Sequence, residues 1–190
     1  MMPNATLSDE TNARLQALAT PLVDTHDSVI ARLLDHWERT QNHAPKLFKP
    51  GEPTKTLSDG KMLFDPANLP NLGFTTPKKM VLDGIVLPKS DTNWNAFLIQ
   101  TIRRVHEGGA SAEDILAKLQ IANAQLGMKN DNGYKFLPDV GLSLQGQDSN
   151  AAFRQTYELA AAFGVSGSVF FIWQDKEKAA YPNMAGIIEF

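Results

Sequence analysis

Hydrophobic residues recur at helical spacing in three segments of the chain. Segment 91–109 places its apolar side chains on one stripe and ends at a Gly-Gly pair. Segment 111–127 begins with the S-x-x-D pattern of a capping box, and a glycine ends it. Segment 149–164 begins at Ser149 as the expected N-cap and also closes on glycine. The pattern predicts three helices.

Shorter apolar runs between and after these helices predict strands. KKMVLDGIVLP, residues 78–88, contains two short runs around an Asp-Gly pair, which is typical of a hairpin. Residues 135–146 are extended, 165–173 form a buried strand, and 183–190 form a terminal strand. We therefore expect an α+β fold, with a C-terminal mixed α/β domain that has a small sheet and about three helices.

A proline-rich stretch precedes this domain, and six of the eleven prolines lie between positions 45 and 77. Proline removes backbone donors and keeps the preceding residue out of helical conformation. We interpret residues 42–60 as a linker. Residues 61–76 are too apolar for free coil and predict a packed irregular arm, so the C-terminal domain is expected to span 61–190.

The first 41 residues predict two short helices. Ser8 is the expected N-cap of the first helix, and Thr25 caps the second. Such a pair is too small to bury its apolar face alone, so we expect a homodimer. The residues expected at the dimer interface are Leu7, Leu15, Leu18, Val29, Ile30, Leu33, Leu34 and Trp37.

The stretch LSDETNARLQALATPLVDTHDSVIARLL, residues 7–34, resembles the ribbon-helix-helix superfamily in the spacing of its apolar anchors. The resemblance covers residues 4–40 and implies a dimer in which two N-terminal strands pair and four helices interlock. The order of a dimerising N-terminus, a linker and a separate DNA-binding C-terminal domain is similar to the SeqA family. FTTPKKMVLDG also resembles a basic loop that enters the DNA-binding domain in that family.

Two departures from the ribbon-helix-helix pattern change the expected role of the N-terminal segment. Val23 stands where the family has a turn glycine, and the outward strand positions Asn4 and Thr6 are small and uncharged. DNA affinity comes largely from cations near phosphates. Residues 1–41 carry three arginines against six acidic residues, so we expect this segment to dimerise rather than to bind DNA.

The residue types of the chain exclude several classes of site. Cysteine is absent, and the four histidines are dispersed, so neither a thiolate site nor a zinc-binding histidine pair is expected. No apolar run approaches the roughly 18 residues of a membrane helix, and no signal-peptide pattern is present. We expect a cytoplasmic, nucleoid-associated protein without cofactor or metal.

Charge is unevenly distributed along the chain, whose net charge is −3. Residues 43–81 hold six lysines against three acidic residues, whereas the segments on either side are net negative. A polyanion is therefore expected to contact the end of the linker and the start of the C-terminal domain.

The candidate DNA contacts are hydroxyl, amide and cationic side chains near turns and near helix starts and ends, where they suit phosphates and base edges. The candidates are Thr75, Thr76, Lys78, Lys79, Lys89, Asn93, Asn95, Arg103, Arg104, Gln145, Gln147 and Asn150. Structural alternatives stay open for several of them. Asn93 suits a helix N-cap, the two arginines suit a helix C-terminus, and the 141–150 loop suits an ordinary strand-to-helix turn.

Together these features predict a homodimeric DNA-binding regulator that binds double-stranded DNA and is sensitive to DNA sequence or base methylation. One alternative is an antitoxin-type operator binder whose C-terminal domain inhibits a protein partner. A second alternative is a magnesium-dependent nuclease that uses Asp139 with the D-K-E-K run at 175–178. A helix between these two motifs departs from the usual nuclease order. A helix-turn-helix formed by residues 93–120 is a further possibility.

Overall fold

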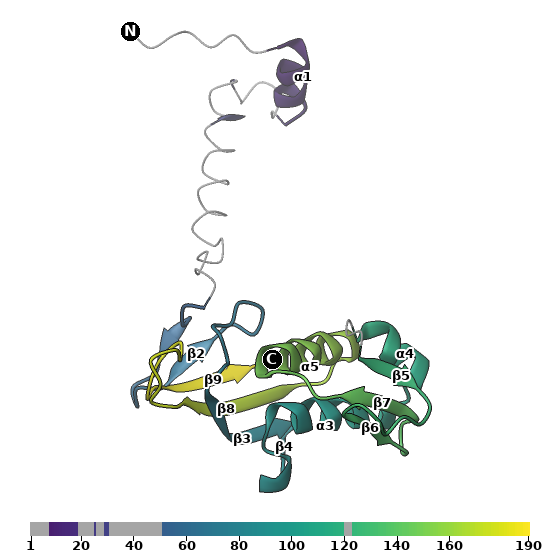
Figure 1. Ribbon diagram of the computed structural model, residues 1–190. Helices are drawn as coiled ribbons and strands as arrows, with labels where there is room; N and C mark the ends of the chain where they lie inside the picture. Colours follow the sequence, from purple (N-terminus) through teal and green to yellow (C-terminus); the bar gives the residue numbers. More distant parts are fainter. Residues whose placement is uncertain (1–7, 19–24, 26–28, 31–50, 120–122) are drawn as a thin grey trace. The chain divides into compact units, whose positions relative to one another are not determined.

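Figure 1 shows the computed structural model, in which the chain divides into two compact units, Met1–Leu47 and Phe48–Phe190. The structure describes residues 8–18, 25, 29–30, 51–119 and 123–190.

In the first unit, helix α1 spans Asp9–Leu18, and the Ser8 hydroxyl accepts a hydrogen bond from the Thr11 amide at 3.3 Å, as expected of an N-cap. Val29 and Ile30 are helical, and Val29 is buried. Four expected dimer contacts lie outside the described residues, as does the expected N-terminal strand. These contacts are Leu7, Leu33, Leu34 and Trp37.

The second unit is built on a six-stranded sheet. Its strands, in spatial order, are β1 (Lys55–Thr56), β2 (Met62–Phe64), β9 (Ala185–Glu189), β8 (Gly167–Trp173), β3 (Thr75–Leu82) and β4 (Ile85–Val86). Neighbouring strands are antiparallel except β2 and β9, which are parallel. Asp83 and Gly84 join β3 to β4 with φ values of 46° and 77°, the left-handed pair that a two-residue hairpin favours. The predicted hairpin is confirmed.

Helices and a smaller sheet complete this unit. The 3₁₀ turn η1 (Lys89–Asp91) leads into α3 (Trp94–Glu107), which is followed by α4 (Ala112–Lys118) and later by α5 (Ser149–Phe163). The smaller sheet has the order β5 (Ala124–Leu126), β7 (Leu142–Gln145) and β6 (Tyr134–Leu137), all antiparallel. The predicted α+β class is confirmed for this unit. Within the described residues, no helix is long and apolar enough to cross a bilayer.

Helices α3 and α5 lie side by side and contribute to two hydrophobic cores (Figure 1). The first core joins them to one face of the large sheet, where Phe171 and Trp173 are completely buried. Edge-to-face rings, such as Trp94 against Phe171 with centroids 5.7 Å apart, give this core its shape. The second core joins the helices to α4 and the smaller sheet. Only one face of the large sheet therefore carries helices in the described part of the chain.

Several boundaries differ from those expected from the sequence. Residues 51–60 of the predicted linker belong to the folded unit, because β1 pairs with β2 and the Thr54 amide donates to the Leu63 carbonyl at 2.8 Å. Residues 42–50 of that linker lie outside the described residues. The predicted irregular arm begins with a strand, β2. The predicted helix 111–127 ends at Lys118, and its last residues form β5 instead, although the Ser111–Asp114 capping box is present.

Candidate nucleic-acid interface

The face of the large sheet opposite the helices carries a continuous row of side chains across five strands. Cross-strand pairing aligns Lys55 with Leu63, Leu63 with Ile187, Ile187 with Phe170, and Phe170 with Lys79. Paired residues project to the same side of a sheet. The three central apolar side chains are partly exposed and the two terminal lysines are exposed, whereas the adjacent row that contains Val169 and Ile188 is buried. We call this surface the open face.

A β-bulge places two lysines side by side at one edge of this row. Pairing between β3 and β8 shifts from Pro77 opposite Phe171 to Lys79 opposite Phe170, so Lys78 is an extra residue. Both lysines are exposed, and neither makes an ion pair or side-chain hydrogen bond with the described residues. Thr76, one step before the bulge, pairs with Ile172 and belongs to the same face. The bulge therefore concentrates unneutralised positive charge beside Phe170.

Lys61 adds a further cation to the centre of the open face. Its Nζ lies 5.2 Å from the centroid of the Phe170 ring, within the range of a cation–π contact. The same Nζ lies 2.6 Å from Asp59 Oδ2, and this hydrogen bond lowers the pKa of Asp59. Asp59 lies in the turn between β1 and β2, and Glu189, at the end of β9, is the acidic residue in the paired rows of this face. Positive charge thus exceeds negative charge on the open face.

The structure accounts differently for the other candidate residues. The Thr75 hydroxyl donates to the Leu72 carbonyl at 2.6 Å and accepts from Trp94 Nε1 at 2.9 Å, so it fixes the start of β3 to helix α3. Asn93 caps α3 by accepting from the Ala96 amide at 2.9 Å. Their polar atoms have structural partners, which leaves little capacity for a nucleic-acid contact.

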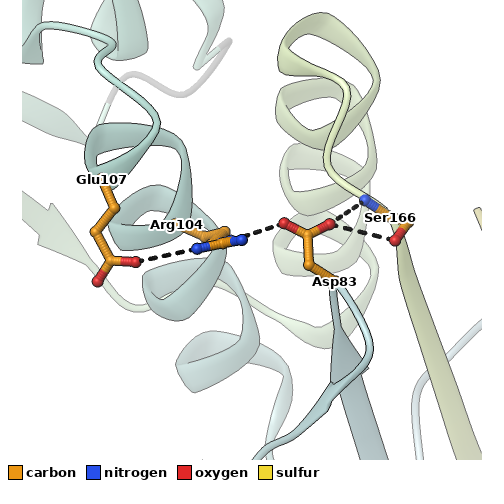
Figure 2. A network of polar contacts seen from close by, with 4 residues as sticks. All are labelled: Asp83, Arg104, Glu107 and Ser166. Atoms are coloured by element: carbon orange, nitrogen blue, oxygen red, sulfur yellow. Dashed lines mark hydrogen bonds and ion pairs between the residues drawn. The ribbon is translucent and has the colours of Figure 1, made fainter.

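Arg104 belongs to a structural network, shown in Figure 2. Asp83 Oδ2 accepts from Arg104 Nε at 2.7 Å, and Oδ1 accepts from the Ser166 amide at 2.9 Å and hydroxyl at 3.2 Å. A second contact, 3.6 Å long, joins the guanidinium to Glu107. The Arg104 hydrogen bond, and next the Ser166 amide, lower the pKa of Asp83. This network ties the β3–β4 turn to α3 and to the start of β8.

Arg103 is paired as well. Its Nε lies 2.7 Å from Asp139 Oδ2, and this hydrogen bond is the main cause that lowers the pKa of Asp139. The carboxylate considered for a nuclease therefore neutralises an arginine. In the described part of the chain, no three His, Asp or Glu side chains gather in a way that could hold a metal ion.

Asn95 and Gln145 line a cleft of about 400 Å³ between the start of α3 and the smaller sheet. Asn95 is committed to holding the loop before α5: its Nδ2 donates to the Gln147 carbonyl at 2.8 Å, and its Oδ1 accepts from the Gln147 amide at 2.8 Å. Gln145 Nε2 donates to the Asn132 carbonyl at 2.8 Å. These amides order the loop rather than present free donors and acceptors to the cleft.

The remaining candidates lie elsewhere. Gln147 Nε2 donates to the Gln145 carbonyl at 3.0 Å. Asn150 accepts from the Leu72 amide at 2.7 Å and anchors the segment before β3 to α5. The N-cap of α5 is Asp148, which corrects the expectation that Ser149 caps it. Lys89 is exposed in the 3₁₀ turn η1 and belongs to none of the paired rows of the open face.

Of the twelve candidates, the structure thus brings together Thr76, Lys78 and Lys79 on the open face. Sequence analysis missed Lys55, Lys61 and Phe170. The signal for Lys55 and Lys61 was available, because an Asp59-Gly60 pair lies between them and Asp-Gly predicts a hairpin.

Comparison with known proteins gave no match, since no family model, curated protein or solved structure aligns significantly with this chain.

Proposed function

We propose that this protein is a DNA-binding regulator whose second unit contacts the phosphate backbone through the open face. The observation that carries the proposal is the pair Lys78 and Lys79, which the bulge of β3 holds exposed and without ion-pair partners among the described residues. Lysines near phosphates release condensed counterions, and this electrostatic gain supplies much of the affinity for nucleic acid. Lys55 extends the positive surface to the far end of the row across the sheet.

Contact between the open face and the DNA phosphate backbone is better supported than recognition of base edges by the amide side chains that the sequence predicted. Asn95, Gln145 and Asn150 all have intramolecular partners, so reading a base edge with them would break existing hydrogen bonds. Among the described residues, the lysine ammonium groups of the open face have no such competing partners except at Lys61.

The first unit is proposed to join two copies of the chain, as its resemblance to ribbon-helix-helix proteins implies. Two linked sheet units would raise the effective affinity of each for a neighbouring stretch of nucleic acid without any new contact. This compensates for the small number of cations on one open face.

The test is binding of the full-length protein to a mixed pool of fluorescent duplex DNA, followed by anisotropy at low salt. Replacing Lys78→Ala and Lys79→Ala together is expected to weaken binding at least tenfold, because two of the unpaired cations are lost. The matched control is Lys118→Ala with Lys135→Ala, which removes the same charge from α4 and β6. Equal effects of both double variants would contradict the assignment of the open face, and a wild type that retained neither duplex nor single-stranded DNA would contradict the function.

A further inference from the structure

We infer that the open face binds single-stranded nucleic acid, with Phe170 as the ring on which a base stacks. This inference rests on the proposed function and specifies its substrate class. It follows from three properties of the face: its width, its central aromatic side chain and the position of its lysines.

The width of the face disfavours entry into a DNA groove. Five strands about 4.8 Å apart give a row about 19 Å long from Lys55 to Lys79. The major groove of B-form DNA is about 12 Å wide and admits a helix or a two-stranded ribbon. A sheet of this breadth meets a duplex only at its outer phosphates, whereas a single strand can lie along the sheet with its bases turned toward it.

Phe170 supplies an aromatic ring for base stacking, which binding of a single strand requires in addition to positive charge. The ring lies near the centre of the row, between Ile187 on β9 and Lys79 on β3, and it is partly exposed. Every base has a π-face, so stacking on an exposed ring is tolerant of sequence. Leu63 and Ile187 continue an apolar floor beside the ring, on which a neighbouring base would also be shielded from water.

The lysines surround this floor at positions that suit a phosphate backbone. Lys55 and Lys79 end the row, and Lys78 extends it at the bulge. Lys61, the residue before β2, places its Nζ 5.2 Å from the centroid of the Phe170 ring and is paired with Asp59. A stacked base would displace this exposed ammonium from the ring, and the exchange is favourable because base stacking outweighs an exposed cation–π contact.

The experiment compares full-length wild type, Phe170→Leu and Phe170→Tyr in anisotropy titrations. The probes are an oligo-dT and an oligo-rU of about 15 nucleotides and a mixed-sequence duplex of equal length. The matched control is Tyr134→Leu, because Tyr134 also carries a lysine over its ring, with Lys129 Nζ at 4.0 Å, but lies on the smaller sheet. Circular dichroism melts check that each variant is folded.

We expect single strands to bind more tightly than duplex. Phe170→Leu should weaken single-strand binding about five- to tenfold with little effect on duplex, and Phe170→Tyr should restore it. Tyr134→Leu should change neither. Tighter binding of oligo-dT than of oligo-rU would identify the ligand as single-stranded DNA, and the reverse would identify it as RNA.

Other outcomes separate the inference from the function on which it rests. Duplex binding as tight as single-strand binding, or a Phe170→Leu protein that binds both as wild type does, would overturn the inference and leave DNA binding in place. Absence of binding to every probe would overturn both. Absence of binding together with dissociation of an oligomer by Phe170→Leu, measured by sedimentation, would assign the face to a second copy of the chain.

Discussion

Asp83 gives the most specific test of how the second unit is held together. Its carboxylate accepts from Arg104 and twice from Ser166, and its φ of 46° places it in the left-handed region. Asp83→Asn is the appropriate change, because asparagine tolerates this conformation as well as aspartate does. The substitution keeps one acceptor oxygen but turns an amide donor toward another donor, either Arg104 or Ser166.

The expected loss is about 1 kcal/mol of unfolding free energy at pH 7. A hydrogen bond to a charged group contributes about 1.5–3 kcal/mol when buried. The Asp83 side chain is 25% exposed to solvent, which reduces that contribution. For a chain of this length, a loss of about 1 kcal/mol corresponds to a fall of about 2–4 °C in Tm. Asp139→Asn is the control, since its ion pair with Arg103 is more exposed, with 48% of the Asp139 side chain accessible, and its loss should cost less.

The stabilisation by the Asp83 carboxylate should decrease as the pH falls. The pKa of Asp83 is lowered in the folded state, so its contribution is complete above the unfolded value of about 3.9 and is lost as the pH falls through the folded value. Thermal melts from pH 7 downward should therefore show the difference between wild type and Asp83→Asn shrinking below about pH 4. Equal melting at pH 7, or a difference that persists in full at about pH 2, would refute this interpretation of the network.

Two further changes test the packing of the sheet and the loop before α5. Gly186→Ala should cost about 1–3 kcal/mol, because the added Cβ would lie 2.5 Å from Phe171 Cζ and 3.0 Å from Trp173 Cζ3. Urea unfolding measures the cost, and wild-type stability would mean that the rings move aside freely. Asn95→Ala should cost about 1–3 kcal/mol, since it removes the side-chain partners of both the backbone N–H and the backbone carbonyl of Gln147. Hydrogen exchange should show a faster Gln147 amide, and unchanged exchange would contradict the role of Asn95.

The helices and the β3–β4 hairpin were predictable because their signals are local. Trp94, Phe97 and Ile102 recur at helical spacing, and all three are buried in α3. The Asp83-Gly84 pair favours the left-handed conformations of a two-residue hairpin turn without help from distant residues. By contrast, the helix expected to continue beyond Lys118 gives way to β5, where pairing with β7 decides the conformation. Such tertiary contacts override weak helical propensity and cannot be inferred from the segment alone.

The open face was only partly predictable. Lys78 and Lys79 were identified from charge, but the bulge that aligns them with Phe170 depends on the pairing of strands far apart in the sequence. The strand 165–173 was expected to be buried, and its alternation instead buries Val169 and Phe171 while Phe170 and Ile172 remain partly exposed. A continuous apolar run does not reveal which of its two faces lacks a covering layer.

The salt dependence of binding tests the proposed role of the open face most directly. Lys55, Lys78 and Lys79 are its lysines without an ion pair among the described residues. If each neutralises one phosphate of a single strand, log K against log salt concentration should have a slope of about −2. Lys78→Ala with Lys79→Ala should reduce the slope to about −0.7, while Lys118→Ala with Lys135→Ala leaves it unchanged. A slope that is the same in all three proteins would contradict phosphate binding by this face.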